Sequence, residues 1–196
     1  MPISLPMADA PPPERADAAR NRETILAAAS RLVDELGVER VSMDAVAREA
    51  GVGKGTLFRR FHSREGLMAA VLDRSESAWQ ASVLSGPPPL GPGAPPYERL
   101  LAMGHSRLRL NVTHGALIKA ATGSHGARSR AAASFAIMHL RHLLSELHVE
   151  GDLPLLAVAL LAPLDIVVVE QQQADDVTLD RIEAAWDDLV RRVVGH

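Results

Sequence analysis

The sequence contains no cysteine, carries little net charge and shows no feature of a leader peptide. The lack of cysteine excludes disulfide bonds and thiolate metal sites, and it agrees with a protein of the reducing cytoplasm. The formal net charge is only −3 over 196 residues, so any affinity for nucleic acid must come from a local cationic patch. Hydrophobic residues make up 47% of the chain, which is enough to bury one core or two small ones.

Two segments, 1–16 and 153–169, could be mistaken for membrane-directing features. Residues 1–16 are rich in proline without a basic start or a long apolar stretch, so we expect a disordered tail rather than a signal peptide. A DNA-binding arm is the alternative for this tail. The apolar run at 153–169 is short for a membrane span and contains Pro163 and Asp165, so we expect a buried helix that is kinked at Pro163 and no contact with a membrane.

The segment 41–61, VSMDAVAREAGVGKGTLFRRF, carries the most informative pattern. Apolar residues recur at helical spacing in its first half, and Ser42 precedes them as an N-cap. Gly51 stands where a helix ends in the left-handed conformation, which costs glycine little. A second helix is predicted from Gly53 or Lys54, with Leu57 and Phe61 directed inward. Ser63 is expected to cap a further helix.

This helix–turn–helix pattern predicts that the second helix enters the major groove of DNA. Five Lys and Arg residues between Arg48 and Arg64 supply the local positive charge. We expect Lys54 and Thr56 to contact base edges, and Arg59 and Arg60 to divide between bases and phosphates. The complete set of candidate DNA-binding residues is Ser42, Lys54, Gly55, Thr56, Phe58, Arg59, Arg60 and Arg64.

Two other interpretations of this segment are weaker. A solvated basic hairpin would not require the glycine turn, the small elbow residues and the outward charge to coincide. The string GVGKGT suggests a phosphate-binding loop, but Arg48 occupies the place of its first glycine and Gly55 the place of its Ser or Thr.

From about residue 21 to residue 72 the chain resembles the DNA-binding domain of the TetR family of transcriptional regulators. The matching residues are Ile25, Leu26, Ala28, Ala29, Gly37, Ser42, Met43, Val46, Ala47, Ala50, Gly51, Val52, Gly55, Thr56, Leu57, Phe61, Ser63, Glu65 and Leu67. Phe58 departs from the usual tyrosine, which removes a hydroxyl that contacts phosphate. Arg64 replaces the usual lysine and keeps its charge.

We therefore predict an all-α protein. An N-terminal three-helix helix-turn-helix domain at 17–66 is followed by a helical effector-binding and dimerisation domain at 67–196. Helices are expected at 17–36, 64–84, 97–111, 128–148 and 153–169, with a last helix capped by Thr178. A short apolar piece at 115–122 is expected to be broken by glycine on both sides.

The last two helices carry more apolar surface than one small body hides easily, so we expect two copies to pair through them; packing inside a single subunit is the alternative. The resemblance to the TetR family implies the same dimer. Ten acidic residues against three arginines between Glu150 and His196 indicate that this end faces away from DNA. Two recognition helices related by a two-fold axis predict a palindromic double-stranded DNA target.

The TetR resemblance also implies a small-molecule effector, bound in a mostly apolar pocket with a few polar groups. The candidate effector-binding residues are His105, Arg109, His114, Phe135, Met138, His139 and Asp165. Alternatively, His105 and Arg109 lie on a wet helical face and Asp165 bonds across the dimer interface. His139, His142 and Glu146 share one helical face at metal-ligand spacing, but no fourth ligand stands out, so we predict neither a metal nor a cofactor.

These features favour a sequence-specific, dimeric repressor that a small-molecule effector releases from an inverted-repeat operator. No nucleophile, base and orienting group recur at a spacing that suggests an enzyme. The alternative is a non-specific, architectural helix-turn-helix protein without an effector.

Overall fold

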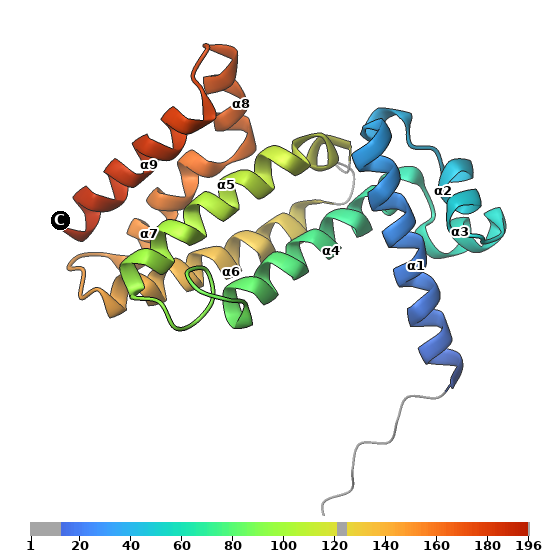
Figure 1. Cartoon of the computed structure of the whole chain (residues 1–196), viewed down its shortest axis with the longest axis horizontal. Helices are drawn as coiled ribbons and strands as arrows, with labels where there is room; N and C mark the ends of the chain where they lie inside the picture. Colours follow the sequence, from blue (N-terminus) through green and yellow to red (C-terminus); the bar gives the residue numbers. More distant parts are fainter. Residues whose placement is uncertain (1–12, 121–124, 196) are drawn as a thin grey trace, which may run out of the picture. The chain divides into compact units, whose positions relative to one another are not determined.

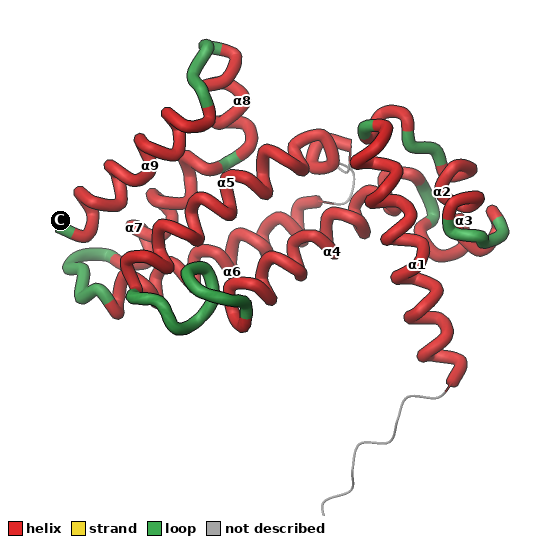
Figure 2. The backbone as a smooth tube through the Cα atoms, viewed as in Figure 1, coloured by secondary structure: helices red, strands yellow, loops and turns green. Residues whose placement is uncertain are grey.

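The computed structural model describes residues 13–120 and 125–195, with side chains over 17–120 and 133–195. Within these ranges the secondary structure is helical and contains no strand, which confirms the predicted all-α class (Figure 2). By its internal contacts the chain divides into two compact units, Met1–Leu67 and Met68–His196.

The first unit contains three helices and the start of a fourth. They are α1 (Pro13–Leu36), the 3₁₀ turn η1 (Val38–Arg40), α2 (Met43–Glu49), α3 (Lys54–Phe61) and the first turn of α4 (Arg64–Ser85) (Figure 1). Helix α1 begins at Pro13, before the expected residue 17, because proline at a first helical position already has a helical φ and lacks an N–H that would go unpaired. The rest of the predicted tail, residues 1–12, lies outside the described residues.

The core of the first unit consists of apolar residues from three helices. Their side chains are at most 6% exposed, and they come from α1 (Ile25, Leu26, Ala28, Ala29), α2 (Val46, Ala47) and α3 (Leu57, Phe61). Neither α2 nor α3 is long enough to be stable alone, so α2 depends on its packing against α1 and α3 on its packing against α2.

The second unit contains the rest of α4 and the helices that follow it. These are α5 (Pro96–Ala120), α6 (His125–Glu146), α7 (Leu153–Leu161), the 3₁₀ turn η2 (Ala162–Leu164), α8 (Ile166–Ala174) and α9 (Leu179–Val194). Helix α5 packs against α6, α8 and α9, and α7 packs against α6 and α9. The central helix α5 is therefore covered on several sides (Figure 1).

Helix α5 corrects one prediction from the sequence. Glycine was expected to break the helix at 115, yet α5 continues to Ala120. Gly104 and Gly115 are positions of close packing: a Cβ on Gly104 would lie 2.1 Å from the Trp186 ring, and one on Gly115 would lie 3.0 Å from Ile166. Glycine therefore admits a neighbouring side chain here, and the packing offsets its poor helix propensity.

The predicted kink at Pro163 is confirmed as a break between two short helices. Pro163 lies in η2, and the segments Leu153–Leu164 and Ile166–Ala174 are bent by 44°. Asp165 restarts the chain as the N-cap of α8, where its carboxylate accepts a hydrogen bond from Val167 N at 2.9 Å. In the described part of the chain no single helix has the length and apolar character to cross a membrane; only this bent pair passes such a test, by length and composition.

Candidate nucleic-acid interface and effector site

Helices α2 and α3 form a helix-turn-helix whose local signals act as predicted. The Ser42 side chain caps α2 by accepting a hydrogen bond from Ala45 N at 3.2 Å. Gly51 has φ of 65°, the left-handed conformation that ends α2. Gly53 is the N-cap of α3, and Ser63 Oγ accepts from Gly66 N at 3.1 Å at the start of α4.

The outward face of α3 carries the candidate DNA-binding side chains. Lys54, Gly55, Phe58 and Arg59 are exposed, whereas Thr56 is half-buried. A Cβ at Gly55 would meet no atom within 4 Å, so the surface above this residue is open to the close approach of a ligand. Helix α3 therefore presents a cationic surface with a single exposed aromatic ring, that of Phe58.

Lys54 is held by a residue of α2. Its Nζ lies 2.7 Å from the Asp44 carboxylate, and it also lies 6.0 Å from the centre of the Phe58 ring. Both partners of the ion pair are well exposed, so water screens the attraction and Lys54 can exchange Asp44 for a phosphate or a base. Asp44 was not predicted to belong to the site; its distance of ten residues from Lys54 gives no helical-spacing signal.

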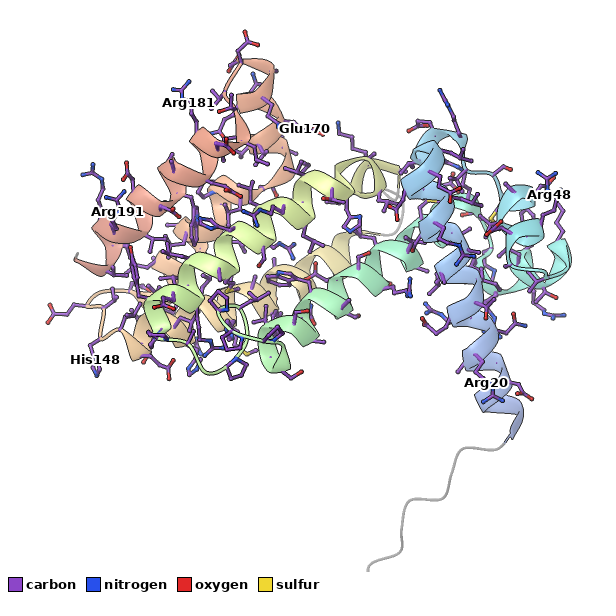
Figure 3. The ribbon with its side chains drawn as sticks, viewed as in Figure 1. Arg20, Arg48, His148, Glu170, Arg181 and Arg191 are labelled. Carbon is purple, nitrogen blue, oxygen red and sulfur yellow. The ribbon has the colours of Figure 1, made fainter. Side chains whose placement is uncertain are left out.

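The two arginines at the end of α3 differ in their surroundings. Arg60 donates a hydrogen bond to the Ala18 carbonyl of α1, whereas Arg59 makes no hydrogen bond or ion pair with any part of the chain that the structure describes. Arg48 of α2 also points outward (Figure 3) and adds an exposed cation beside the predicted set. Arg59 is thus the predicted residue that is most available to DNA.

Arg64 has a structural role that the sequence did not indicate. Its Nε donates to the Val41 carbonyl at 2.9 Å, and its Nη2 donates to the Val38 carbonyl. These bonds tie the first turn of α4 to the segment that leads into α2. The guanidinium expected to contact phosphate is therefore engaged with the protein's own backbone.

Two of the predicted effector residues, His105 and Arg109, form pairs with α9. His105 Nε2 lies 2.6 Å from Asp187 Oδ1, and Arg109 Nε donates to Glu183 at 3.1 Å. Both pairs join α5 to α9, where they lie one helical turn apart. Asp165 serves as a helix cap, and the half-buried His114 lies near the end of α5.

The other predicted effector residues lie together on α6. The Phe135 ring stacks on His139 with centroids 6.1 Å apart and planes 6° apart, and it meets Trp79 of α4 edge-on at 5.8 Å. His139 is only 7% exposed, and its Nε2 lies 3.3 Å from Arg99 Nη2. Met138 is 56% exposed and lines a groove of about 540 Å³ between α6 and the start of α7.

Burial, the neighbouring Arg99 and His142 together lower the pKa of His139 from 6.5 to about 4. The imidazole is therefore neutral near pH 7, and its Nε2 accepts a hydrogen bond from Arg99. In the described part of the chain no group of three or more His, Cys, Asp or Glu side chains is arranged to hold a metal ion. His142 and Glu146 of the suggested triad are 3.7 Å apart.

The low pKa of His139 predicts that acid destabilises the second unit. Between about pH 6.5 and pH 4 the unfolded chain binds a proton at His139 and the folded chain does not, so stability falls as the pH falls. We expect His139 to account for a loss of about 2 kcal/mol between neutral pH and pH 5. Urea denaturation at both pH values measures this loss. His139→Phe should flatten the dependence and His142→Gln should not; an unchanged slope in His139→Phe would contradict the assignment.

Known proteins share both the N-terminal domain and the fold. The family model for bacterial regulatory proteins of the tetR family matches residues 25–71. The chain is 45% identical to an HTH-type transcriptional regulator of Staphylococcus aureus strain USA300 over 60 residues. This alignment covers 31% of the chain and 32% of that regulator. The chain thus aligns with about a third of the length of the curated relatives that it matches.

Solved structures of similar fold cover most of the chain. Escherichia coli NemR, in its reduced form, has a TM-score of 0.62 and 20% identity, over 88% of this chain and 96% of NemR. A TetR-like regulator from Rhodococcus sp. RHA1 has a TM-score of 0.58 and 21% identity, over 91% and 98% of the two chains. SmeT, solved in complex with triclosan, has a TM-score of 0.60 and 17% identity, over 88% and 90%. Residues 25–71 thus match the N-terminal domain of the tetR family of bacterial regulatory proteins, and the fold of the chain is similar to that of TetR-like regulators.

Proposed function

We propose that the protein is a dimeric repressor that binds an inverted-repeat operator through α3 and is released by a small-molecule effector. The observation that carries this proposal is the outward face of α3. Lys54 and Arg59 project there from a short helix that is fixed by a buried apolar face. Such a helix fits the major groove, where arginine can donate two hydrogen bonds to guanine.

The distribution of charge supports a division of labour. The segment from Glu150 to the C-terminus is strongly acidic, whereas α3 carries Lys54, Arg59 and Arg60 and no acidic residue. DNA phosphates attract α3 and repel the end of the second unit. This difference favours one orientation of the protein on a duplex.

An unpaired apolar surface on α7 and α8 supports a dimer. Leu155, Val158, Val167 and Val168 are exposed, with Leu155 at 66% and Val167 at 71%. A second copy that covers these side chains would remove them from water, at about 25 cal/mol per Å² of apolar surface. Two copies would also present two α3 helices to successive major grooves, about 34 Å apart.

Two proteins of similar fold support the effector. SmeT was solved with triclosan, and the similar FrrA is described as flavonoid-responsive. We propose that an effector bound to the second unit changes the preferred position of α4, the helix that begins in the first unit and ends in the second. The effector releases DNA only to the extent that it binds the released state more tightly.

Selection of bound duplexes from a random pool tests the proposal. An enriched inverted repeat, bound by two copies of the chain, is the expected result. Lys54→Ala and Arg59→Ala should each weaken the selected duplex by at least about tenfold and relax its base preference. Equal binding to selected and random duplexes at physiological salt would instead support a non-specific architectural protein.

The Asp44–Lys54 ion pair predicts a substitution that strengthens DNA binding, in contrast to Lys54→Ala and Arg59→Ala, which should weaken it. Asp44→Asn should strengthen binding to any duplex by about threefold to tenfold at low salt, because it removes a negative charge and frees Lys54 for phosphate. The dependence of log Kd on log salt should steepen by about one unit.

A matched control comes from the second ion pair of α2. Glu49→Gln frees Arg31 of α1 rather than a residue of α3, and we expect a smaller change. If Asp44→Asn weakened binding, Asp44 would be positioning Lys54 for DNA instead of competing with it.

A further inference from the structure

The guanidinium of Arg99 lacks a counter-charge. Its Nε is fully buried without a hydrogen-bond partner, and no described carboxylate forms an ion pair with it. Arg107, two turns further along α5, also has a buried Nε without a partner, but its Nη1 pairs with Glu76 at 2.7 Å, and both of those side chains are about 15% exposed. Arg99 is partly buried, so an anion that accepts a hydrogen bond from its buried Nε would stabilise it.

His139 occupies the remaining side of Arg99 without supplying charge. The low pKa of this histidine keeps it neutral, so it can only accept the Nη2–H at 3.3 Å. A carboxylate would be a better partner, since its two oxygens match the parallel Nε–H and Nη2–H donors of one guanidinium edge. One oxygen of such a ligand would replace His139 as the acceptor for Arg99 Nη2–H, and the other would accept from the buried Arg99 Nε–H.

Aromatic rings adjoin this charged pair. Phe135 stacks on His139 and contacts Trp79, and the Trp79 ring lies 5.0 Å from the Arg107 guanidinium. The rings and the two arginines thus form a continuous series across α4, α5 and α6. A ligand anchored at Arg99 would place its body against flat apolar surfaces.

The groove between α6 and α7 is separated from the Arg99–His139 pair by His142. His142 lines this groove, and its ring lies 5.9 Å from the His139 ring. The His142 side chain is 55% exposed and can turn toward solvent. Arg141 adds a positive charge to the groove wall, and the volume of about 540 Å³ lies within the range for small-molecule sites.

We propose that this region binds an organic acid, with Arg99 holding its carboxylate and Phe135 contacting its apolar body. The site deepens the proposed function, because it assigns the effector to a chemical class. It also gives roles to Phe135, Met138 and His139, which the sequence had selected as candidates. His105 and Arg109 are left to join α5 and α9.

Titration of the full-length protein with benzoate and its neutral isostere benzamide tests the site. We expect calorimetry to show benzoate binding at least about tenfold more tightly than benzamide, because only the acid supplies the missing charge. The Arg99 Nε–H resonance should shift with benzoate. No shift with benzoate or hexanoate at about 10 mM, a concentration that saturates a site with a Kd of about 1 mM, would overturn the proposal. Equally tight binding of inorganic phosphate would overturn the assignment to an organic acid.

Substitutions locate the site. Arg99→Gln should weaken benzoate by at least about tenfold, and Arg99→Lys should weaken it less, since lysine keeps the charge but has no Nε–H and Nη2–H edge. Arg181→Gln, on the exposed face of α9 (Figure 3), should leave the affinity unchanged. If Arg99→Gln did not fold, Arg99→Lys and the comparison of benzoate with benzamide would still test whether Arg99 holds the carboxylate. Unchanged benzoate affinity in a folded Arg99 variant would place the acid elsewhere.

Operator binding, measured on the same preparation, separates the two proposals. A protein that binds its inverted repeat but ignores carboxylates would refute this site and leave the repressor intact. A protein that binds benzoate through Arg99 but has no preferred duplex would refute the repressor and leave the site.

Discussion

Gly104→Ala should destabilise the second unit by about 3 kcal/mol, although alanine is the better helix former. A Cβ at this position would lie 2.1 Å from the Trp186 ring, far inside contact distance. The ring is 2% exposed and cannot move away freely, because its Nε1 donates to the Leu160 carbonyl at 2.8 Å. The methyl group must therefore displace α9 from α5 or break that hydrogen bond. Thermal unfolding, followed by circular dichroism, measures the loss.

A double-mutant cycle with Trp186→Leu isolates the clash. Trp186→Leu alone should cost about 3 kcal/mol through the cavity that it leaves. Adding Gly104→Ala to this variant should cost little, because the methyl group then enters vacated space. Additive losses would show that Gly104→Ala acts through some other contact.

Local signals explain why much of the fold could be predicted from the sequence. Ser42, Gly51 and Thr178 each act on the backbone within a few residues, and all three end or begin a helix where expected. The exception was the middle of the second unit. Gly115 was interpreted as a break because only the folded chain shows that Ile166 occupies the space beside it. The sequence shows that a glycine leaves space beside the helix, but it does not show which side chain fills that space.

In the candidate site, too, local patterns could be predicted from the sequence, whereas contacts between distant residues could not. Periodicity predicted which side chains of α3 face outward, but not which partners hold them. Asp44 approaches Lys54 across a turn, and Ala18 approaches Arg60 from another helix. The ion pairs between α5 and α9, by contrast, correspond to a spacing that is visible in the sequence. His105 and Arg109 are four residues apart, and so are their partners Asp187 and Glu183, as two antiparallel helical faces require.

Arg64→Ala should lower the stability of the first unit by about 3 kcal/mol and weaken all duplexes alike. The guanidinium makes two hydrogen bonds to the carbonyls of Val38 and Val41, and bonds from a charged donor are each worth about 1.5 to 3 kcal/mol. Their loss frees the segment that leads into α2, on which α3 is packed. Helix α3 is then less ordered whichever duplex it binds, so base preference should not change. Urea unfolding and duplex titration on the same variant measure both effects.

Arg64→Lys decides between this support and a direct phosphate contact. Lysine keeps the positive charge but cannot donate to both carbonyls with the fixed geometry of a guanidinium. If Arg64 supports α2, Arg64→Lys should lose a large part of the stability that Arg64→Ala loses, and duplex binding should fall with it. If Arg64 contacts phosphate, Arg64→Lys should bind duplexes almost normally, and Arg64→Ala should remain as stable as the native protein. Stability and affinity that fall in parallel across both variants are the expected result, because the same two carbonyl bonds govern both.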